Sequence, residues 1–365
     1  MNLKHISEYR NKEVCQKLVE KIWATSNKEI RLMEVCGTHT MSIARNGIRQ
    51  LLPENITLIS GPGCPVCVTS QKEIDQFLKL TEYENVSITT FGDLIRVPGS
   101  HSSLQKERAN GADIRVVYST LDCLQIAENN PEKQVVFLGV GFETTAPTIA
   151  AAILEANKRH LKNFSVVSAH KLVPPALTAL MENKKVAVNG FICPGHVSVI
   201  IGAQAYETVA QDYQIPCVIA GFEPVDILQS ILMLVEQIEK GRAEVEIAYK
   251  RGVTYDGNKR ARDILAQVFN SCDTDWRGLG MIPQSGLKIR ADYKKFNAQH
   301  RFDLSVEDVM EPEGCACGEV LCGILSPIEC VLFGKGCTPD DPIGPCMVST
   351  EGTCAAYYKY QIDLS

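Results

Sequence analysis

Hydrophobic and polar positions follow one repeated order along the first two thirds of the chain. From residue 29 to residue 222, a short apolar run rich in β-branched residues precedes a Gly-, Pro-, Ser- or Thr-rich turn and an amphipathic stretch. This order is typical of parallel strands joined by helices. The runs that predict strands are Ile30–Val35, Ile56–Ser60, Val86–Phe91, Ile114–Tyr118, Val135–Leu138, Phe164–Ser168, Gly190–Cys193 and Cys217–Ala220.

Helical patterns lie between most of these runs, and the repeated order stops near Gly241. Helices are predicted over Thr69–Leu80, Pro147–Lys158, Pro174–Met181 and Val225–Lys240. The region that follows is more polar, shows few strand signals and leads into a cysteine-rich tail. We expect an N-terminal helix with a first strand-turn unit in 1–48, α/β domains in 49–130 and 131–241, and a third domain in 242–365.

Reactive side chains directly follow several predicted strands. Cys36-Gly37-Thr38-His39 follows the first strand, and Cys64-Pro65-Val66-Cys67 follows the second. Glu143 with Thr144 and Thr145, and later His196, follow two others. Open parallel sheets bind ligands beyond the carboxyl ends of their strands. We therefore expect an α/β fold of two parallel-sheet domains whose strand-end motifs face a cleft.

Cysteine usage is the most unusual feature of the composition. The 365-residue chain contains 15 cysteines, an odd number, and it is long enough to bury large cores without disulfide bonds. Its first thirty residues lack the apolar core of a secretory signal, so we expect a cytoplasmic protein in a reducing compartment. The cysteines therefore indicate metal binding or thiol chemistry.

Charge and motif content disfavour several functional classes. A formal net charge of −6 and the lack of an apolar run long enough to span a bilayer argue against nucleic-acid and membrane partners. The turns contain no Gly-x-Ser-x-Gly elbow, no phosphate loop ending in Gly-Lys-Ser/Thr and no convincing Gly-x-Gly-x-x-Gly. Hydrolase, kinase and dinucleotide-enzyme functions therefore lose support.

The C-terminal cysteines carry the strongest chemical signal. Seven fall between residues 315 and 354, in the order Cys317-x12-Cys330-x6-Cys337-x16-Cys354 with Cys315, Cys322 and Cys346 as additional thiols. Four thiolates are the usual support of an iron-sulfur cluster. Zinc is the competitor, but its structural sites usually show paired Cys-x2-4-Cys knuckles, and only Cys315-x-Cys317 is that tight here. The spacing favours a cluster over zinc.

The two N-terminal cysteine motifs leave alternatives open. A Cys-x-x-Cys at a helix start, here Cys64 and Cys67, suits thiol-disulfide exchange or soft-metal ligation, and half of a zinc knuckle has equal weight. Cys36 and His39 could share a metal, or the imidazole could assist the thiol as a proton carrier. Their place at a strand end favours function over coincidence.

Five motifs together resemble the HypD family of hydrogenase maturation proteins. The resemblance covers essentially the whole chain in order and rests on Cys36 to Thr40, Gly61 to Cys67, Gly141 to Pro147, Pro194 to Ser198 and Gly344 to Cys354. It implies two α/β domains and a C-terminal domain with a [4Fe-4S] cluster. It also implies a maturation scaffold with redox-active thiols, rather than a conventional turnover enzyme, on which the Fe(CN)2CO centre of [NiFe] hydrogenase is assembled.

The resemblance further implies partners and residue roles. The partners would be HypC, a small chaperone that shares the iron, and HypE, which presents cyanide as a thiocyanate and links the complex to HypF. Cys36 would hold the mononuclear iron that carries cyanide and carbon monoxide, and Cys64 and Cys67 would be a redox pair. The supporting site residues would be His39, His196 and Glu351.

The cluster ligands that we favour within the family pattern are Cys317, Cys330, Cys337 and Cys354. Cys315 and Cys346 are alternative ligands, and Cys322 is expected not to bind the cluster. Two other functions compete with the scaffold: an iron-sulfur-dependent thiol-disulfide reductase, which would not need Cys36 and His39, and a zinc-stabilised interaction module, which would leave the strand-end motifs without a role.

Overall fold

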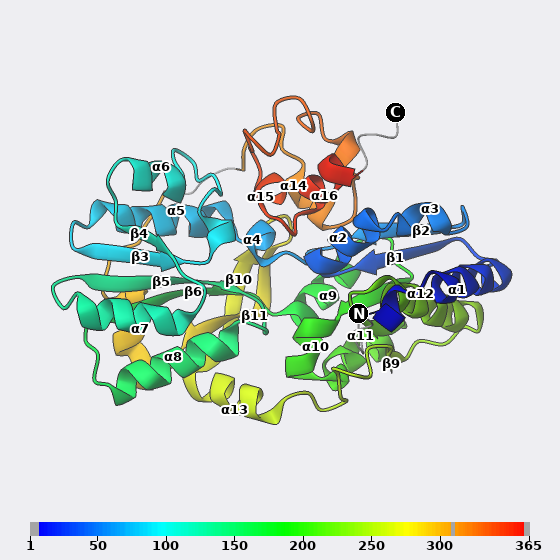
Figure 1. Cartoon of the computed structure of the whole chain (residues 1–365), viewed down its shortest axis with the longest axis horizontal. Coiled ribbons are helices and arrows are strands. Elements are labelled where there is room, and N and C mark those ends of the chain that lie inside the picture. The colour runs from blue at the N-terminus through cyan, green and yellow to red at the C-terminus, as the bar shows by residue number, and fades with distance from the viewer. Residues whose placement is uncertain (1–6, 308–310, 361–365) are drawn as a thin grey trace.

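Two parallel sheets lie side by side in the computed structural model, which describes residues 7–307 and 311–360 (Figure 1). The first has the order β2-β1-β7-β8-β9, and the second the order β4-β3-β5-β6. The bounds of the first are β1 Ile30–Glu34, β2 Ile56–Ser60, β7 Gly190–Pro194, β8 Cys217–Ala220 and β9 Val245–Ile247. Those of the second are β3 Val86–Thr90, β4 Ile114–Val116, β5 Gln134–Gly141 and β6 Phe164–His170. The predicted α/β class is confirmed.

The first sheet is assembled from two distant parts of the chain. Parallel pairing joins Leu32 of β1 to Gly190 of β7, so residues 30–60 and 190–247 share one sheet. The second sheet is formed by the chain between them. The sheets therefore do not follow the contiguous ranges 49–130 and 131–241, because hydrophobic periodicity identifies a strand without identifying its neighbour.

Helices cover both faces of each sheet. In the first sheet, α1 (Lys12–Thr25) packs against α12 (Pro224–Glu239), and their apolar faces bury Leu18, Ile22 and Ile231 over β1 and β8. In the second, α7 (Thr120–Asn129) and α8 (Ala146–Lys158) lie on one side of the strands, and α5 (Gln71–Lys79) and α6 (Leu104–Ala109) lie on the other (Figure 1). A capping box between Ser70 and Glu73 begins α5.

An antiparallel hairpin occupies the region where the sequence shows few strand signals. Its strands are β10 (Phe269–Trp276) and β11 (Gly280–Ile289). Many of its residues stay exposed, which explains why no clear apolar alternation marks it. The ammonium group of Lys171, itself fully buried, reaches Glu73 at 2.7 Å and the Asp275 carbonyl at 2.6 Å, and so joins the hairpin to the second sheet.

A small C-terminal domain covers the region where the two sheets meet. Its helices are α14 (Cys317–Leu321), α15 (Pro345–Val348) and α16 (Thr353–Tyr360) (Figure 1). Contacts join α15 to α4 (Pro65–Val68), and α16 to α2 (Gly37–Arg45). Among the described residues the longest helix, α12, has 16 residues, and no helix is long and apolar enough to cross a bilayer.

Candidate functional site

Four neighbouring strands of the first sheet end at one edge, and each contributes side chains there. Cys64 follows β2, Cys36 follows β1, His196 follows β7 and Phe222 follows β8. The strand order reverses between β1 and β7, which makes this position the topological switch point where parallel sheets bind ligands. The fold therefore gathers three sequence motifs at the place where a site is expected.

The Cys36 thiol lies at the centre of this arrangement. Cys36 is the N-cap of α2, its side chain is 1% exposed, and its Sγ lies 3.6 Å from Nδ1 of His196. Burial, helped by the Glu351 carboxylate, raises the pKa of the Cys36 thiol to about 12. The thiol is therefore protonated at neutral pH, and binding a metal here would release its proton.

Two neutral imidazoles flank one aromatic ring beside this thiol. Burial lowers the pKa of His39 and of His196 to about 4. Their rings lie 5.1 Å and 5.6 Å from the ring of Phe222, between centroids. Nε2 of neutral His39 donates to the Gly221 carbonyl at 2.9 Å, which leaves Nδ1 as an acceptor with no partner among the described residues.

Two glycines allow the backbones of the site to meet. The N–H of Gly37 donates to the Gly63 carbonyl at 2.9 Å, and a Cβ at Gly63 would lie 2.2 Å from the Cys36 nitrogen. A Cβ at Gly37 would lie 2.4 Å from the Glu351 carbonyl oxygen. Any other residue would separate these segments, so both positions require glycine for close approach.

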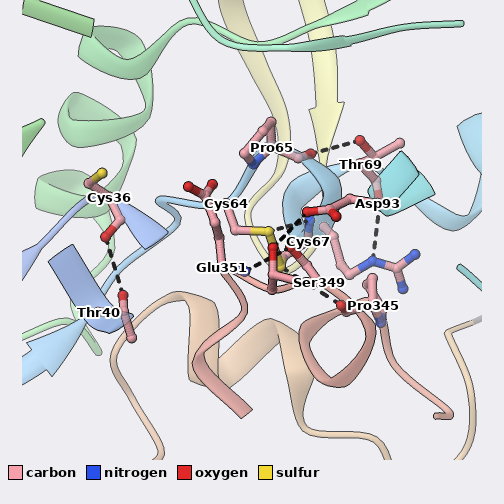
Figure 2. The surroundings of a disulfide bond; sticks show 12 residues. Cys36, Thr40, Cys64, Pro65, Cys67, Thr69, Asp93, Pro345, Ser349 and Glu351 are labelled. Atoms are coloured by element: carbon pink, nitrogen blue, oxygen red, sulfur yellow. Dashed lines mark hydrogen bonds between the residues drawn. A yellow bond between two sulfur atoms is a disulfide. The ribbon is translucent and has the colours of Figure 1, made fainter. Parts of the chain in front are cut away.

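Cys64 and Cys67 form a disulfide in this structure (Figure 2). The pair begins α4, and its side chains are 3% and 0% exposed. Sγ of Cys67 lies 3.9 Å from the carbonyl oxygen of Pro345, the residue before Cys346. The disulfide is thus closed off from solvent and faces the segment of the C-terminal domain that carries one of the tail cysteines.

Glu351 connects the C-terminal domain to the first sheet. The Thr38 hydroxyl donates to Oε1 of Glu351 at 2.6 Å, and burial raises the pKa of this carboxyl. Glu351 and Ser349 are among the residues drawn around the disulfide in Figure 2. All six residues expected at the N-terminal site therefore lie along one edge of the first sheet or on the loop that covers it.

Six of the seven tail cysteines line one small pocket. Cys317, Cys337, Cys346 and Cys354 are buried there, whereas Cys315 and Cys330 are half-buried. Hydrogen bonds from Cys317 and Cys354 lower the pKa of the Cys346 thiol. Cys322 lies outside the pocket, where its thiol donates to the Gly278 carbonyl at 3.4 Å.

The donor set of this pocket fits an iron-sulfur cluster. No three His, Cys, Asp or Glu side chains among residues 7–307 and 311–360 surround a point suited to a single metal ion. The pocket offers only thiols, the usual donors to a cluster, whose inorganic core separates its ligands more widely than one ion does. Gly344 permits this crowding, because a Cβ there would lie 2.9 Å from Sγ of Cys315. The cluster and its exact ligands remain predictions.

Two residues near the site were not singled out from the sequence. Phe222 contacts both imidazoles, and its only sequence signal was the repeated Gly-Phe-Glu turn. Glu34 is fully buried two residues before Cys36 and accepts a 2.6 Å hydrogen bond from Ser60; burial raises its pKa to about 7. A carboxylate inside a buried apolar strand was the signal that could have found it.

Glu143 does not belong to the site at the edge of the first sheet. It follows β5 of the second sheet, and its Oε1 accepts a hydrogen bond of 2.9 Å from the N–H of Val173. The carboxylate thus serves the first turn of α9 (Val173–Glu182), although its position after a strand had suggested an acid-base group of the site.

Comparison with known proteins agrees with this geometry. The family model named HypD, described as the hydrogenase formation hypA family, matches residues 13–361. A hydrogenase maturation factor HypD2 from Bradyrhizobium diazoefficiens is 46% identical over 98% of this chain and 97% of its own length. The hydrogenase maturation factor HypD of Cupriavidus necator has the same identity and coverage. A putative hydrogenase expression/formation protein from Methanocaldococcus jannaschii is 42% identical over 96% of this chain and 98% of its own length. The chain therefore belongs to the HypD family of hydrogenase maturation factors.

Proposed function

We propose that this maturation factor is the scaffold on which the iron of the hydrogenase centre receives its cyanide and carbonyl ligands. The observation that carries the proposal is the placement of Cys36 Sγ, 3.6 Å from His196 Nδ1, at the switch point of the first sheet. Iron(II) with such ligands is a soft cargo, which thiolate suits well.

Holding this cargo begins with a proton transfer. The buried Cys36 thiol must lose its proton as iron arrives, because the thiolate is the ligand. Nδ1 of His196 is placed to accept that proton, and the neutral His39 offers a second acceptor beside the same Phe222 ring. The loop that carries Glu351 covers the thiol and limits the access of water.

Delivery of cyanide from a thiocyanate consumes two electrons. The sulfur-carbon bond of the thiocyanate breaks, cyanide carbon bonds to the iron, and the sulfur leaves as a thiol. The reduced Cys64-Cys67 pair supplies both electrons and both protons as its S–S bond forms; one proton goes to the leaving sulfur, and the other goes to solvent while cyanide stays on the iron. In this scheme, the disulfide form of Cys64 and Cys67 is the oxidised state of the pair.

The tail thiols would hold the redox cofactor of this process. Cys317, Cys330, Cys337 and Cys354 are the favoured ligands of a [4Fe-4S] cluster, and Cys315 and Cys346 line the same pocket as substitutes. A bound cluster supplies electrons one at a time. The 3.9 Å contact of Cys67 Sγ with Pro345 places the disulfide against this pocket-forming segment.

We further propose a cytoplasmic complex with HypC, which would share the iron, and with HypE, which would present the thiocyanate; HypF would join through HypE. The half-buried N-terminal end of α12 lies near this edge of the sheet, where the N-cap residue Glu223 forms an ion pair with Arg10. A thiol-disulfide reductase is the weaker candidate, since it would leave the Cys36 thiol and its 3.6 Å contact with His196 without a role.

Replacement of Cys36 tests the scaffold against the reductase. In cells that lack their own family member, a Cys36→Ala variant should give no active hydrogenase, because iron is no longer held. Cys123→Ala, which removes a buried thiol beside the second sheet, is the matched control and should support wild-type maturation. Full hydrogenase activity with Cys36→Ala would contradict the scaffold and favour the reductase.

A further inference from the structure

We propose that electrons enter this protein from a one-electron carrier protein that docks on the surface around Cys330, with a basic rim on the carrier. The docking surface consists of Ile328, Cys330 and Val331 and is called the Cys330 patch here. This inference rests on the proposed function, because it concerns reduction of the tail pocket and, through it, of the Cys64-Cys67 disulfide.

Direct reduction of the disulfide is blocked by its burial. Cys64 and Cys67 are 3% and 0% exposed, and α4 packs against α15 of the C-terminal domain. A soluble thiol needs in-line access to a sulfur atom to reduce a disulfide. Electrons must therefore reach the pair through the protein, and the pocket of tail thiols beside Pro345 is the redox-capable neighbour.

The cysteines that line the tail pocket differ in their exposure. Cys346 is 1% exposed, lies on α15 and is next to the residue that touches Cys67. Cys330 lines the same pocket but is only half-buried, in a turn where its Sγ lies 3.8 Å from the Gly314 carbonyl. The pocket thus has one wall against the disulfide and another at the surface.

The surface wall is flanked by unusually exposed aliphatic side chains. Ile328 is 68% exposed and Val331 is 70% exposed, two and one positions from Cys330. The turn between them is ordered by backbone hydrogen bonds from Cys330 N to Pro327 O and from Phe333 N to Cys330 O. These two side chains give the surface wall an apolar centre beside Cys330, and an apolar centre with a polar rim is a feature of protein docking sites.

Charge around the patch defines the partner. Glu329 lies between Ile328 and Cys330 in the chain, and Glu313 precedes Gly314, whose carbonyl oxygen is 3.8 Å from Cys330 Sγ. In the segment 311–341, five carboxylates are exposed, at Glu313, Glu319, Glu329, Asp340 and Asp341, against one exposed cation at Lys335, while Glu311 is paired with Arg277. Opposite charge around an apolar centre raises the association rate of transient complexes. The fitting partner is therefore a carrier whose redox group lies near an apolar surface edged by lysine or arginine.

The stoichiometry is fixed by the disulfide. Two successive encounters deliver one electron each, and two protons from solvent complete the conversion of the Cys64-Cys67 disulfide into two thiols. Each encounter oxidises one carrier by one electron. The complex must dissociate between encounters, which suits a small patch with a charged rim better than a large apolar interface.

Cytochrome c, a one-electron carrier with lysines around its haem edge, is a suitable probe of the Cys330 patch. The electron transfer is measured in the reverse direction, from the reduced protein to oxidised cytochrome c. Anaerobically reduced protein is mixed with oxidised cytochrome c, and haem reduction is followed by its absorbance. Ile328→Ser with Val331→Ser should slow this transfer about tenfold. Glu313→Lys, next to the Gly314 carbonyl that contacts Cys330, should slow it several-fold at low salt, with the difference disappearing at high salt. Calorimetry should show the same loss in affinity for cytochrome c.

Two controls separate failure of this inference from failure of the proposed function. Ferricyanide, a small oxidant, should oxidise all variants at the wild-type rate, and Tyr118→Ser, at a 95% exposed site beside the second sheet, should leave the cytochrome reaction unchanged. If ferricyanide oxidation is normal and the patch variants keep the wild-type cytochrome rate and affinity, the docking surface is wrong. Protein that carries no iron and sulfide contradicts the proposed function itself.

Discussion

The two parallel sheets have similar strand orders, with five and four strands, yet among the described residues only the first places a thiol and an imidazole at its switch point. In the first sheet, Cys36 and His196 face each other across β1 and β7. The second sheet reverses its order between β3 and β5, where Asp93 and Glu143 follow the strands. There, Asp93 accepts a hydrogen bond of 3.0 Å from Thr350 of the C-terminal domain, and Glu143 binds a backbone N–H. Topology provides a place for a site, and the side chains decide whether chemistry occurs there.

The sequence Gly-Phe-Glu occurs in two turns, at 141–143 beside the second sheet and at 221–223 beside the first, and its phenylalanine has a different role in each. Phe142, in the second sheet, is buried and stacks on Trp276 of the hairpin with 6.1 Å between ring centroids. Phe222, in the first sheet, packs against both imidazoles of the site. One turn closes a core, while the other packs against the two histidines of the candidate site.

The largest expected effect is loss of the redox thiols beside the first sheet. Cys67→Ala should abolish maturation, because a single remaining thiol cannot supply two electrons by forming the internal disulfide. Hydrogenase activity in complemented cells measures this. Cys272→Ala, which removes a half-buried thiol of the hairpin, should keep full activity. Equal loss of activity in both variants would contradict a special role for the thiols beside the first sheet.

Next in size is the buried ion pair that fastens the hairpin to the second sheet. Lys171→Met should lower the free energy of unfolding by about 3–5 kcal/mol, because the Glu73 carboxylate loses its partner. Chemical denaturation measures the change. Lys158→Met, at an ammonium that is 81% exposed, should stay within about 0.5 kcal/mol of wild type. Similar losses of unfolding free energy in both variants would show that the Lys171–Glu73 ion pair contributes little to stability.

The paired phenylalanines should separate stability from function. Phe142→Ala should cost about 3 kcal/mol of stability, because it leaves a cavity beside Trp276. Phe222→Ala, at a half-buried ring, should cost about 1 kcal/mol but lower maturation about tenfold, since His39 and His196 lose their common support. The control is a variant with the same melting temperature as Phe222→Ala but with an unchanged candidate site. If Phe222→Ala lowers maturation no more than this control does, the proposed role of Phe222 in supporting the two imidazoles is wrong.

The last expected effect depends on pH and vanishes below pH 4.5. Burial raises the pKa of Glu143 in the folded state to about 7 from a usual value of 4.5. The folded protein therefore holds a proton that the unfolded chain releases, and this group's contribution to stability is full below pH 4.5 and is lost as pH rises to about 7. Relative to wild type, Glu143→Gln should gain up to about 3 kcal/mol across that window. Urea denaturation at several pH values measures it; a constant difference would contradict the raised pKa.

Much of the fold could be predicted because local pattern controls it. The runs Ile56–Ser60 and Cys217–Ala220 coincide with β2 and β8, since short apolar runs between turn residues have few other uses in an α/β protein. Pairing of β1 with β7 could not be predicted, because it depends on contacts between residues about 160 positions apart. The hairpin β10–β11 was hidden by its polar, partly exposed strands.

The residues of the candidate site could be predicted from sequence motifs, but how tightly they pack together could not. Cys36, His39, His196 and Glu351 were chosen from motifs, and the structure gathers them. The depth of burial was not visible in the sequence, because it depends on how tightly Gly37 and Gly63 let neighbouring backbones approach. The spacing of the tail cysteines also does not decide which of the six pocket thiols would hold the predicted cluster.

Infrared spectroscopy of the anaerobically purified protein tests the central claim most directly, with iron and sulfide analysis on the same samples. Wild-type protein co-expressed with its partners should show cyanide and carbonyl stretching bands as well as cluster iron and sulfide. Cys36→Ala should lose the bands and retain the cluster, because the tail pocket is separate from the Cys36 thiol. Bands that persist in Cys36→Ala, or that are missing from both proteins while the cluster is present, would contradict the assignment of Cys36 as the residue that holds the iron.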